Sequence, residues 1–248
     1  MSARRLSNGV DWWNRQAGRR SAIAGGHGIT RAPKEGRYLF TTRGIAMKTL
    51  RLTPILTALF AAFLFTSLSW AGEIKGKVDV QGLRSPENIA VYVDAIPGKT
   101  FDPPSHHVTI DQRKMTFIPH VIVVVKGTTV EFLNSDPVGH NVYWPSISGN
   151  KKLAHNMGTW PKGQTKSFQF NDLGVASLLC NVHPEMSGYV VVVAAPYFTV
   201  ANKEGEFEIK NVPDGHYTLK TWSENGKPAT QTVDVSGGAA KAELTVKK

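Results

Sequence analysis

The stretch IPHVIVVVKGTTVEFLN, residues 118–134, decides the fold class. Its first half is a run of branched apolar residues that ends at Lys126. Its second half alternates apolar and polar side chains through Val130 and Phe132. Short runs of branched and aromatic residues on both sides of a glycine turn are typical of two β-strands. The sequence therefore predicts two strands joined by a turn at Gly127.

Similar short segments recur on both sides of this pair. Between residues 72 and 248, no stretch of roughly 12 residues has a convincing helical face. Several short strands at this spacing are typical of a sandwich or barrel, so the predicted class is all-β. The other predicted strands lie near Ile74–Val80, Ala90–Val93, Val108–Ile110, Lys166–Phe170, Val175–Leu179 and Tyr189–Val193.

A secretory signal peptide is predicted over residues 47–71. MKTLRLT gives a positive start, PILTALFAAFLFTSLS gives an apolar core, and small residues at Ser69 and Ala71 suit the signal peptidase. We expect cleavage after Ala71 and a periplasmic product with no stable membrane insertion. The alternative is an uncleaved anchor, because the apolar run approaches the length that spans a membrane.

Residues 1–46 show neither strand alternation nor a helical stripe. A signal sequence acts from the true N-terminus. We therefore interpret this segment as a disordered start-site overcall, with translation beginning at Met47. Its Arg-Arg pairs are not followed directly by an apolar core, so they do not indicate twin-arginine export.

The formal net charge of +10 lies almost entirely in the predicted leader. Residues 1–71 hold 11 basic residues but only Asp11 and Glu35, which leaves 18 basic and 17 acidic residues in the rest of the chain. The charge therefore indicates no nucleic-acid partner. Cys180 is the only cysteine in the sequence, which excludes an intramolecular disulfide and sites built from several thiolates.

The sequence texture changes after Pro196. The segment TVANKEGEFEIKNVPDGHYTLKTW, residues 199–222, alternates on both sides of a Pro-Asp-Gly turn. With its NKEG and NVPDG turns, the portion 196–248 resembles the second half of a carboxypeptidase regulatory-like β-sandwich. So short a piece has too little core to be stable alone. We expect it to share the strands of residues 72–100, which makes 101–195 an insertion; two consecutive modules are the alternative.

The segment LLCNVHPEMSGYVVVV, residues 178–193, spaces Cys180, His183 and Met186 three residues apart between two apolar strands. This spacing on a tight loop lets the three side chains converge. Upstream, His140 follows a predicted strand and can reach the same end of a sandwich. Two imidazoles, one thiolate and one thioether are the ligand set of a blue-copper centre.

This pattern resembles the cupredoxins, and the Cys-x-x-His-x-x-Met loop is similar to that of amicyanin and the plastocyanin-like proteins associated with methylamine utilisation. The resemblance covers residues 101–195 and implies a Greek-key β-sandwich that holds one type 1 copper. The ligands it implies are His140 as the N-terminal imidazole, Cys180 as the thiolate, His183 as the exposed imidazole and Met186 as the weak axial ligand. It also implies that Asn141 ties the two ligand loops together.

Packing alone is the competing interpretation of these residues, because free cysteines and methionines are often buried hydrophobes. An unpaired thiol in an exported protein is nevertheless an oxidation hazard unless it is buried or metal-bound, which favours the copper site. His155 and Met157 are candidates for a second copper, but two ligands make an incomplete site. Three other histidines are interpreted as solvated or structural: His106, His107 and His120.

The leading functional hypothesis is one-electron transfer with transient redox protein partners and no enzymatic activity. Four protein ligands leave copper no open position for a substrate. His183 would be the exit for the electron, with Pro184, Trp144 and Pro145 as apolar residues around it. The alternatives are a periplasmic copper carrier or storage protein and a structural sandwich with incidental copper. A copper oxidase or nitrite reductase needs further clustered histidines, and no His-x-His pair occurs.

Overall fold

A computed structural model of the chain describes residues 71–248, all of which lie in one compact unit. The predicted overcall 1–46 and the signal peptide, apart from Ala71, lie outside the described residues. The described part is all-β and contains one short 3-10 turn at Lys151–Leu153. No helix in residues 71–248 is long and apolar enough to cross a membrane.

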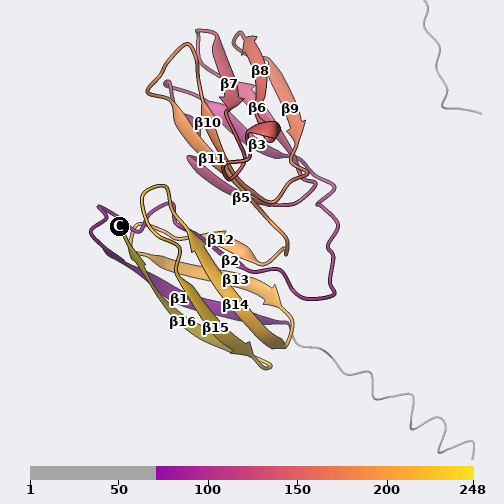
Figure 1. Cartoon of the computed structure of the whole chain (residues 1–248), viewed down its shortest axis with the longest axis vertical. Coiled ribbons are helices and arrows are strands. Elements are labelled where there is room, and N and C mark those ends of the chain that lie inside the picture. The colour runs from indigo at the N-terminus through magenta and orange to yellow at the C-terminus, as the bar shows by residue number, and fades with distance from the viewer. Residues whose placement is uncertain (1–70) are drawn as a thin grey trace, which may run out of the picture. The chain divides into compact units, whose positions relative to one another are not determined.

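The middle of the chain forms a sandwich of two sheets (Figure 1). A four-stranded sheet has the order β4-β3-β6-β9, and a five-stranded sheet has the order β5-β11-β10-β7-β8. β3 runs parallel to β6 and β5 runs parallel to β11, whereas the other neighbouring strands of these two sheets are antiparallel. The strands are β3 (Val108–Gln112), β4 (Phe117–Ile118), β5 (Val121–Val125), β6 (Thr129–Asn134), β7 (His140–Trp144), β8 (His155–Trp160), β9 (Thr165–Gln169), β10 (Gly174–Leu179) and β11 (Ser187–Val193).

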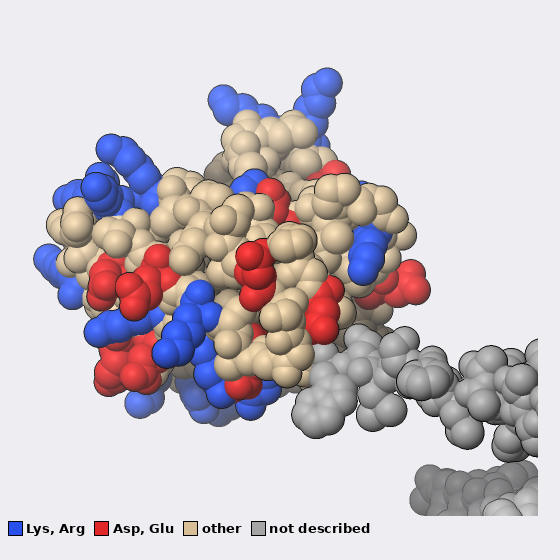
Figure 2. Space-filling model, turned by 90° about the horizontal axis from the view of Figure 1, so that it is seen from below, with Lys and Arg blue, Asp and Glu red and all other residues tan. Residues whose placement is uncertain are grey.

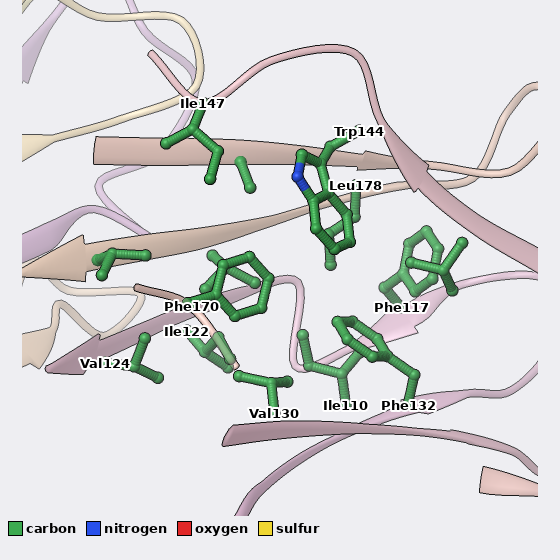
Figure 3. Packing of buried hydrophobic residues seen from close by; sticks show 14 of the residues in the cluster. Ile110, Phe117, Ile122, Val124, Val130, Phe132, Trp144, Ile147, Phe170 and Leu178 are labelled. Atoms are coloured by element: carbon green, nitrogen blue, oxygen red, sulfur yellow. The ribbon is translucent and has the colours of Figure 1, made fainter. Parts of the chain in front are cut away.

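The core of this sandwich lies between its two sheets and is rich in aromatic rings. The inward residues of β6 alternate with outward ones, as the sequence pattern predicts. Figure 3 shows Trp144 and Phe170 close together among branched side chains from both sheets. The ring centroids of Trp144 lie 4.8 Å from Phe168 and 5.2 Å from Phe170. This packing anchors β7, the strand that begins at His140.

A second sandwich is built from both ends of the described chain. One sheet has the order β13-β1-β16 and the other has the order β12-β2-β14-β15. Its strands are β1 (Gly72–Gln81), β2 (Ala90–Val93), β12 (Phe198–Val200), β13 (Glu206–Val212), β14 (Gly215–Trp222), β15 (Thr230–Val235) and β16 (Ala239–Lys247). β2 pairs directly with β12, so the two ends of the segment that forms the middle sandwich lie side by side.

An apolar layer joins the two sandwiches within this compact unit. Every residue of β5 is buried, but only Ile122 and Val124 face the core of the middle sandwich. On the other face, Val121, Val123 and Val191 cluster with Ala90, and Phe198 and Trp222 of the second sandwich pack against them. A strand that is apolar on both faces is buried on both faces. This explains why the run VIVVV does not alternate.

Charged side chains of both signs are interspersed on the face seen in Figure 2. This agrees with the near balance of 18 basic and 17 acidic residues after residue 71. The described part therefore offers no excess of positive charge to recruit a polyanion.

Val191→Asp should lower the free energy of unfolding by about 3 kcal/mol or more, because it places a carboxylate without a partner in the apolar layer. Val191 is only 2% exposed. Thr165→Asp, on the exposed side of β9, is the control and should change the free energy by less than about 0.5 kcal/mol. Chemical denaturation measures both variants. If Val191→Asp were as stable as the control, β11 would not be covered on its outer face.

Candidate metal centre

The ligand atoms of His140, Cys180 and His183 all lie within 4.8 Å of one another. His140 is the first residue of β7, Cys180 directly follows β10, and His183 lies in the loop between β10 and β11. His140 is fully buried, Cys180 is 3% exposed and His183 is half-buried. One strand and one loop therefore bring two imidazoles and a thiol together at one end of the middle sandwich.

The pairing of β10 with β11 closes the loop that carries three of the predicted ligands. Leu179 is the register partner of Ser187, so residues 180–186 form the whole connection. Within it, the Met186 backbone N–H donates to His183 O at 3.0 Å. Met186 is 1% exposed and lies in the same core cluster as Cys180. The thioether is therefore held on the buried side of the loop.

The two imidazoles face each other through the same ring atom. His183 Nδ1 lies 3.0 Å from His140 Nδ1, and the ring centroids are 4.7 Å apart. A neutral imidazole offers a lone pair at one nitrogen, which is the atom that ligates a metal. Two convergent Nδ1 atoms beside a thiol suit a cation that prefers nitrogen and sulfur donors. This donor set fits copper.

Asp136 orients the buried imidazole, and the sequence analysis did not name it. Its Oδ2 lies 2.8 Å from His140 Nε2, which leaves Nδ1 directed toward Cys180 and His183. The backbone N–H groups of Lys114 and Met115 donate to its two carboxylate oxygens at 2.6 and 2.8 Å.

Burial by itself would raise the pKa of the Asp136 carboxyl. The two backbone donors and the hydrogen bond with His140 outweigh burial and hold this pKa below its ordinary value. Asp136 therefore stays ionised beside the imidazole. The available signal was a carboxylate four residues before His140 in the turn DPVGH.

Asn134 holds the turn that carries Asp136. Its Oδ1 accepts a hydrogen bond from Asp136 N at 2.9 Å, and its Nδ2 donates to Val138 O at 2.8 Å and to Trp160 O at 3.0 Å. The side chain is fully buried. A buried amide whose polar atoms are paired fixes one backbone geometry. The turn between β6 and β7 is therefore rigid where it supports His140.

Asn141 connects the two segments that carry the cluster. Its backbone N–H donates to Cys180 Sγ at 3.4 Å, and its Oδ1 accepts from Asn181 N at 3.3 Å. A hydrogen bond from its Nδ2 to Asn156 Oδ1, at 2.9 Å, also attaches it to β8. An N–H group directed at the sulfur stabilises negative charge on it.

Comparison with known proteins identifies the family. The model of copper-binding proteins of the plastocyanin/azurin family matches residues 104–193. Amicyanin of Paracoccus versutus is 30% identical over 97 residues, which cover 39% of this chain and 72% of amicyanin. Amicyanin-alpha of Methylorubrum extorquens is 30% identical over 89 residues, which cover 36% and 74%. The chain belongs to the plastocyanin/azurin family. Its cofactor is copper.

Two further matches concern the solved structures and the second sandwich. A reduced Cu(I) form of an amicyanin mutant matches with a TM-score of 0.33 and 26% identity, covering 41% of this chain and 97% of that one. The model of polysaccharide lyase family 4, domain II, matches residues 174–243. A further β domain is therefore present beside the plastocyanin/azurin match. The resemblance to carboxypeptidase regulatory-like domains stays a prediction.

One residue expected beside the candidate site lies elsewhere. Trp144 was expected near the surface around His183, but it is fully buried in the core. Four of the five residues of β7 are buried, and Trp144 packs with Val142 in the core cluster of the sandwich. Pro145 and Pro184 are exposed, as expected. Larger exposed apolar side chains on nearby loops are Val138, Val182 and Met115, each 45–49% exposed.

The other histidines named in the sequence analysis lie outside the cluster. Among the described residues, His140, Cys180 and His183 form the one group of three metal-binding side chains. The His155 ring packs against Trp144 at 5.2 Å and Phe168 at 4.6 Å. His106 and His107 are exposed, and His107 Nδ1 lies 2.7 Å from Glu131 Oε1.

Asp136→Asn should weaken copper binding by roughly 10- to 100-fold, because residues that orient a metal-binding histidine affect affinity by that amount. Competition with a chelator of known affinity measures the change. Asp172→Asn removes an exposed carboxylate from the same sandwich and should leave the affinity unchanged. Equal affinities for the two variants would contradict the role given to Asp136.

Proposed function

We propose that this protein is an exported type 1 copper protein that carries single electrons and is not an enzyme. The observation that supports this most directly is the convergence of the His140, Cys180 and His183 ligand atoms within 4.8 Å, with Met186 buried in the same core. Four protein ligands leave no open position at which a substrate binds. A closed site that supports two oxidation states is suited to electron transfer.

In this proposal His140, Cys180 and His183 are the equatorial ligands and Met186 is the axial ligand. Copper, when bound, supplies the one-electron couple between Cu(II) and Cu(I). The chain holds its ligands in place: Asp136 fixes the His140 ring, and Asn141 spans the two ligand segments. Ligands fixed before the electron arrives move little when the copper charge changes, which favours fast transfer.

His183 is the proposed electron exit. It is the least buried of the three clustered residues; exposed Val138 lies in the turn just before His140, and exposed Val182 lies in the loop of His183. A small apolar surface suits a transient encounter with a redox protein, because such interfaces are small and separate quickly. The near-balanced charge of residues 72–248 supports a protein partner rather than a nucleic acid.

We divide the exported body as a cupredoxin domain, residues 101–195, inserted in a second sandwich made of 72–100 and 196–248. The pairing of β2 with β12 supports this division, because it joins the two ends of the insertion. A fold in which chain ends lie close together tolerates insertion of a whole domain. The copper domain is thereby attached at two points rather than one.

Cys180→Ser should abolish the intense visible absorption of the Cu(II) protein, because that absorption arises from charge transfer between the thiolate and copper. A hydroxyl is a harder and less acidic ligand than a thiol, so any copper held by His140 and His183 would be nearly colourless. Titration with Cu(II), followed by absorption and thiol labelling, compares the variant with the wild type.

Two outcomes would contradict the proposal in different ways. A colourless wild type would mean that Cys180 is only a packing residue. A blue wild type that loses its copper at each cycle of reduction and oxidation would favour copper carriage or storage over electron transfer.

A periplasmic location is the proposed destination, on the basis of the ordered charged start, apolar core and small-residue exit in residues 47–71. Residues 47–75 fused to a reporter that is active only after export should give an active reporter. Replacing the apolar core with a polar sequence is the control and should leave the reporter inactive. An inactive reporter with the native segment would overturn this assignment.

A further inference from the structure

The strand that follows Met186 is held by a side chain outside the cluster. His120 Nδ1 lies 3.1 Å from Ser187 O, and His120 O accepts a hydrogen bond from Tyr189 N at 2.8 Å. Gly188 lies between these two contacts. A Cβ there would be 2.9 Å from Phe117 Cβ and 3.3 Å from His120 O. The start of β11 is therefore fixed closely against His120.

Glu224 reaches this place from the second sandwich, just beyond the end of β14. Its Oε1 accepts a hydrogen bond from the Tyr189 hydroxyl at 2.6 Å, and its Oε2 lies 3.3 Å from His120 Nε2. Both ring nitrogens of His120 thus face oxygen acceptors. When the ring carries both protons, both contacts are hydrogen bonds and the contact with Glu224 is charge-assisted.

The Tyr189 ring completes the contact between the sandwiches. Its centroid lies 4.9 Å from Trp222 and 5.4 Å from His120. Burial, followed by the hydrogen bond to Glu224 and the charge of that carboxylate, raises the pKa of Tyr189 well above its ordinary value. The phenol therefore remains a hydrogen-bond donor to Glu224.

We propose that Glu224 is a positioning residue for the copper site: through Tyr189 and His120 it fixes the start of β11 and, with it, Met186. The inference rests on the proposed function, in which Met186 is the axial ligand. Glu224 and His120 side chains are 40% and 30% exposed, so their pairing contributes little to overall stability. Glu224 therefore acts on the geometry of the site rather than on folding.

Three variants distinguish a positioning role of Glu224 from an effect of its charge alone. Glu224→Asp keeps the charge but shortens the reach by one methylene. Glu224→Gln removes the charge but keeps the length of the side chain. Its amide oxygen can still accept from the Tyr189 hydroxyl, and its amide N–H can donate to a neutral His120 ring. Tyr189→Phe removes the hydroxyl alone. Glu243→Gln, an exposed position in the same sandwich, is the control for loss of one negative charge.

Two measurements are made on the full exported chain. Hydrogen exchange of the Tyr189 amide in the copper-free protein reports whether β11 is fixed, independently of copper. The reduction potential and the electron self-exchange rate of the copper-loaded protein report the effect on the site.

Glu224→Asp and Tyr189→Phe should speed exchange of the Tyr189 amide by about tenfold, because the local opening becomes easier. They should also raise the reduction potential, since a looser thioether stabilises Cu(II) less, and slow the self-exchange several-fold. Glu224→Gln should resemble the wild type except for a small shift equal to that of Glu243→Gln.

The opposite ranking of the two Glu224 variants overturns the inference. If Glu224→Gln changed the amide exchange and the reduction potential strongly and Glu224→Asp changed neither, Glu224 would act through its charge alone. Unchanged amide exchange in all variants would show that Glu224 does not fix β11. A wild type without the thiolate-to-copper absorption overturns the proposed function and the copper part of this inference together. A blue wild type with unchanged variants overturns this inference alone.

Discussion

The antiparallel pairing of β10 with β11 is the constraint on which the metal centre and its support depend. It joins Leu179 to Ser187 and leaves seven residues to connect them, so Cys180 and Met186 stand at the two ends of one short loop. His183 lies between them and has little freedom to move away. The pairing therefore helps to bring Cys180 and His183 together and leaves Met186 buried in the same core cluster as Cys180.

β11 also runs parallel to β5, and this pairing extends the constraint to the second sandwich. Both strands are buried on both faces. One face of the pair packs against the aromatic core, and the opposite face packs against β2, β12 and β14. Removal of the second sandwich would expose the valines on the outer face of β5 and β11 to water. The two sandwiches consequently depend on each other for apolar burial, beyond their two covalent connections.

Much of this organisation was predictable from local patterns. Period-two alternation and branched runs gave the strands, and the soft donor set near Cys180 gave the candidate ligands, because both signals lie within a few residues. Trp144 was misplaced because its nearness to His140 in the sequence does not tell that its strand packs into the aromatic core. Asp136 was missed because a carboxylate in a turn is usually a turn residue. Glu224 had no local signal, since its contacts lie 35 and 104 residues away in sequence.

The two imidazoles of the centre have different supports, and this difference divides their roles. His140 is fully buried, and its far ring nitrogen contacts a carboxylate that the backbone keeps ionised. Any positive charge that develops at His140 is therefore balanced inside the protein. His183 faces His140 through Nδ1, and its ring is partly open to solvent. In the proposed function, a partner protein that covers His183 would change the surroundings of this imidazole without disturbing the other, so the exposed ligand would respond to docking while the buried ligand keeps the site in place.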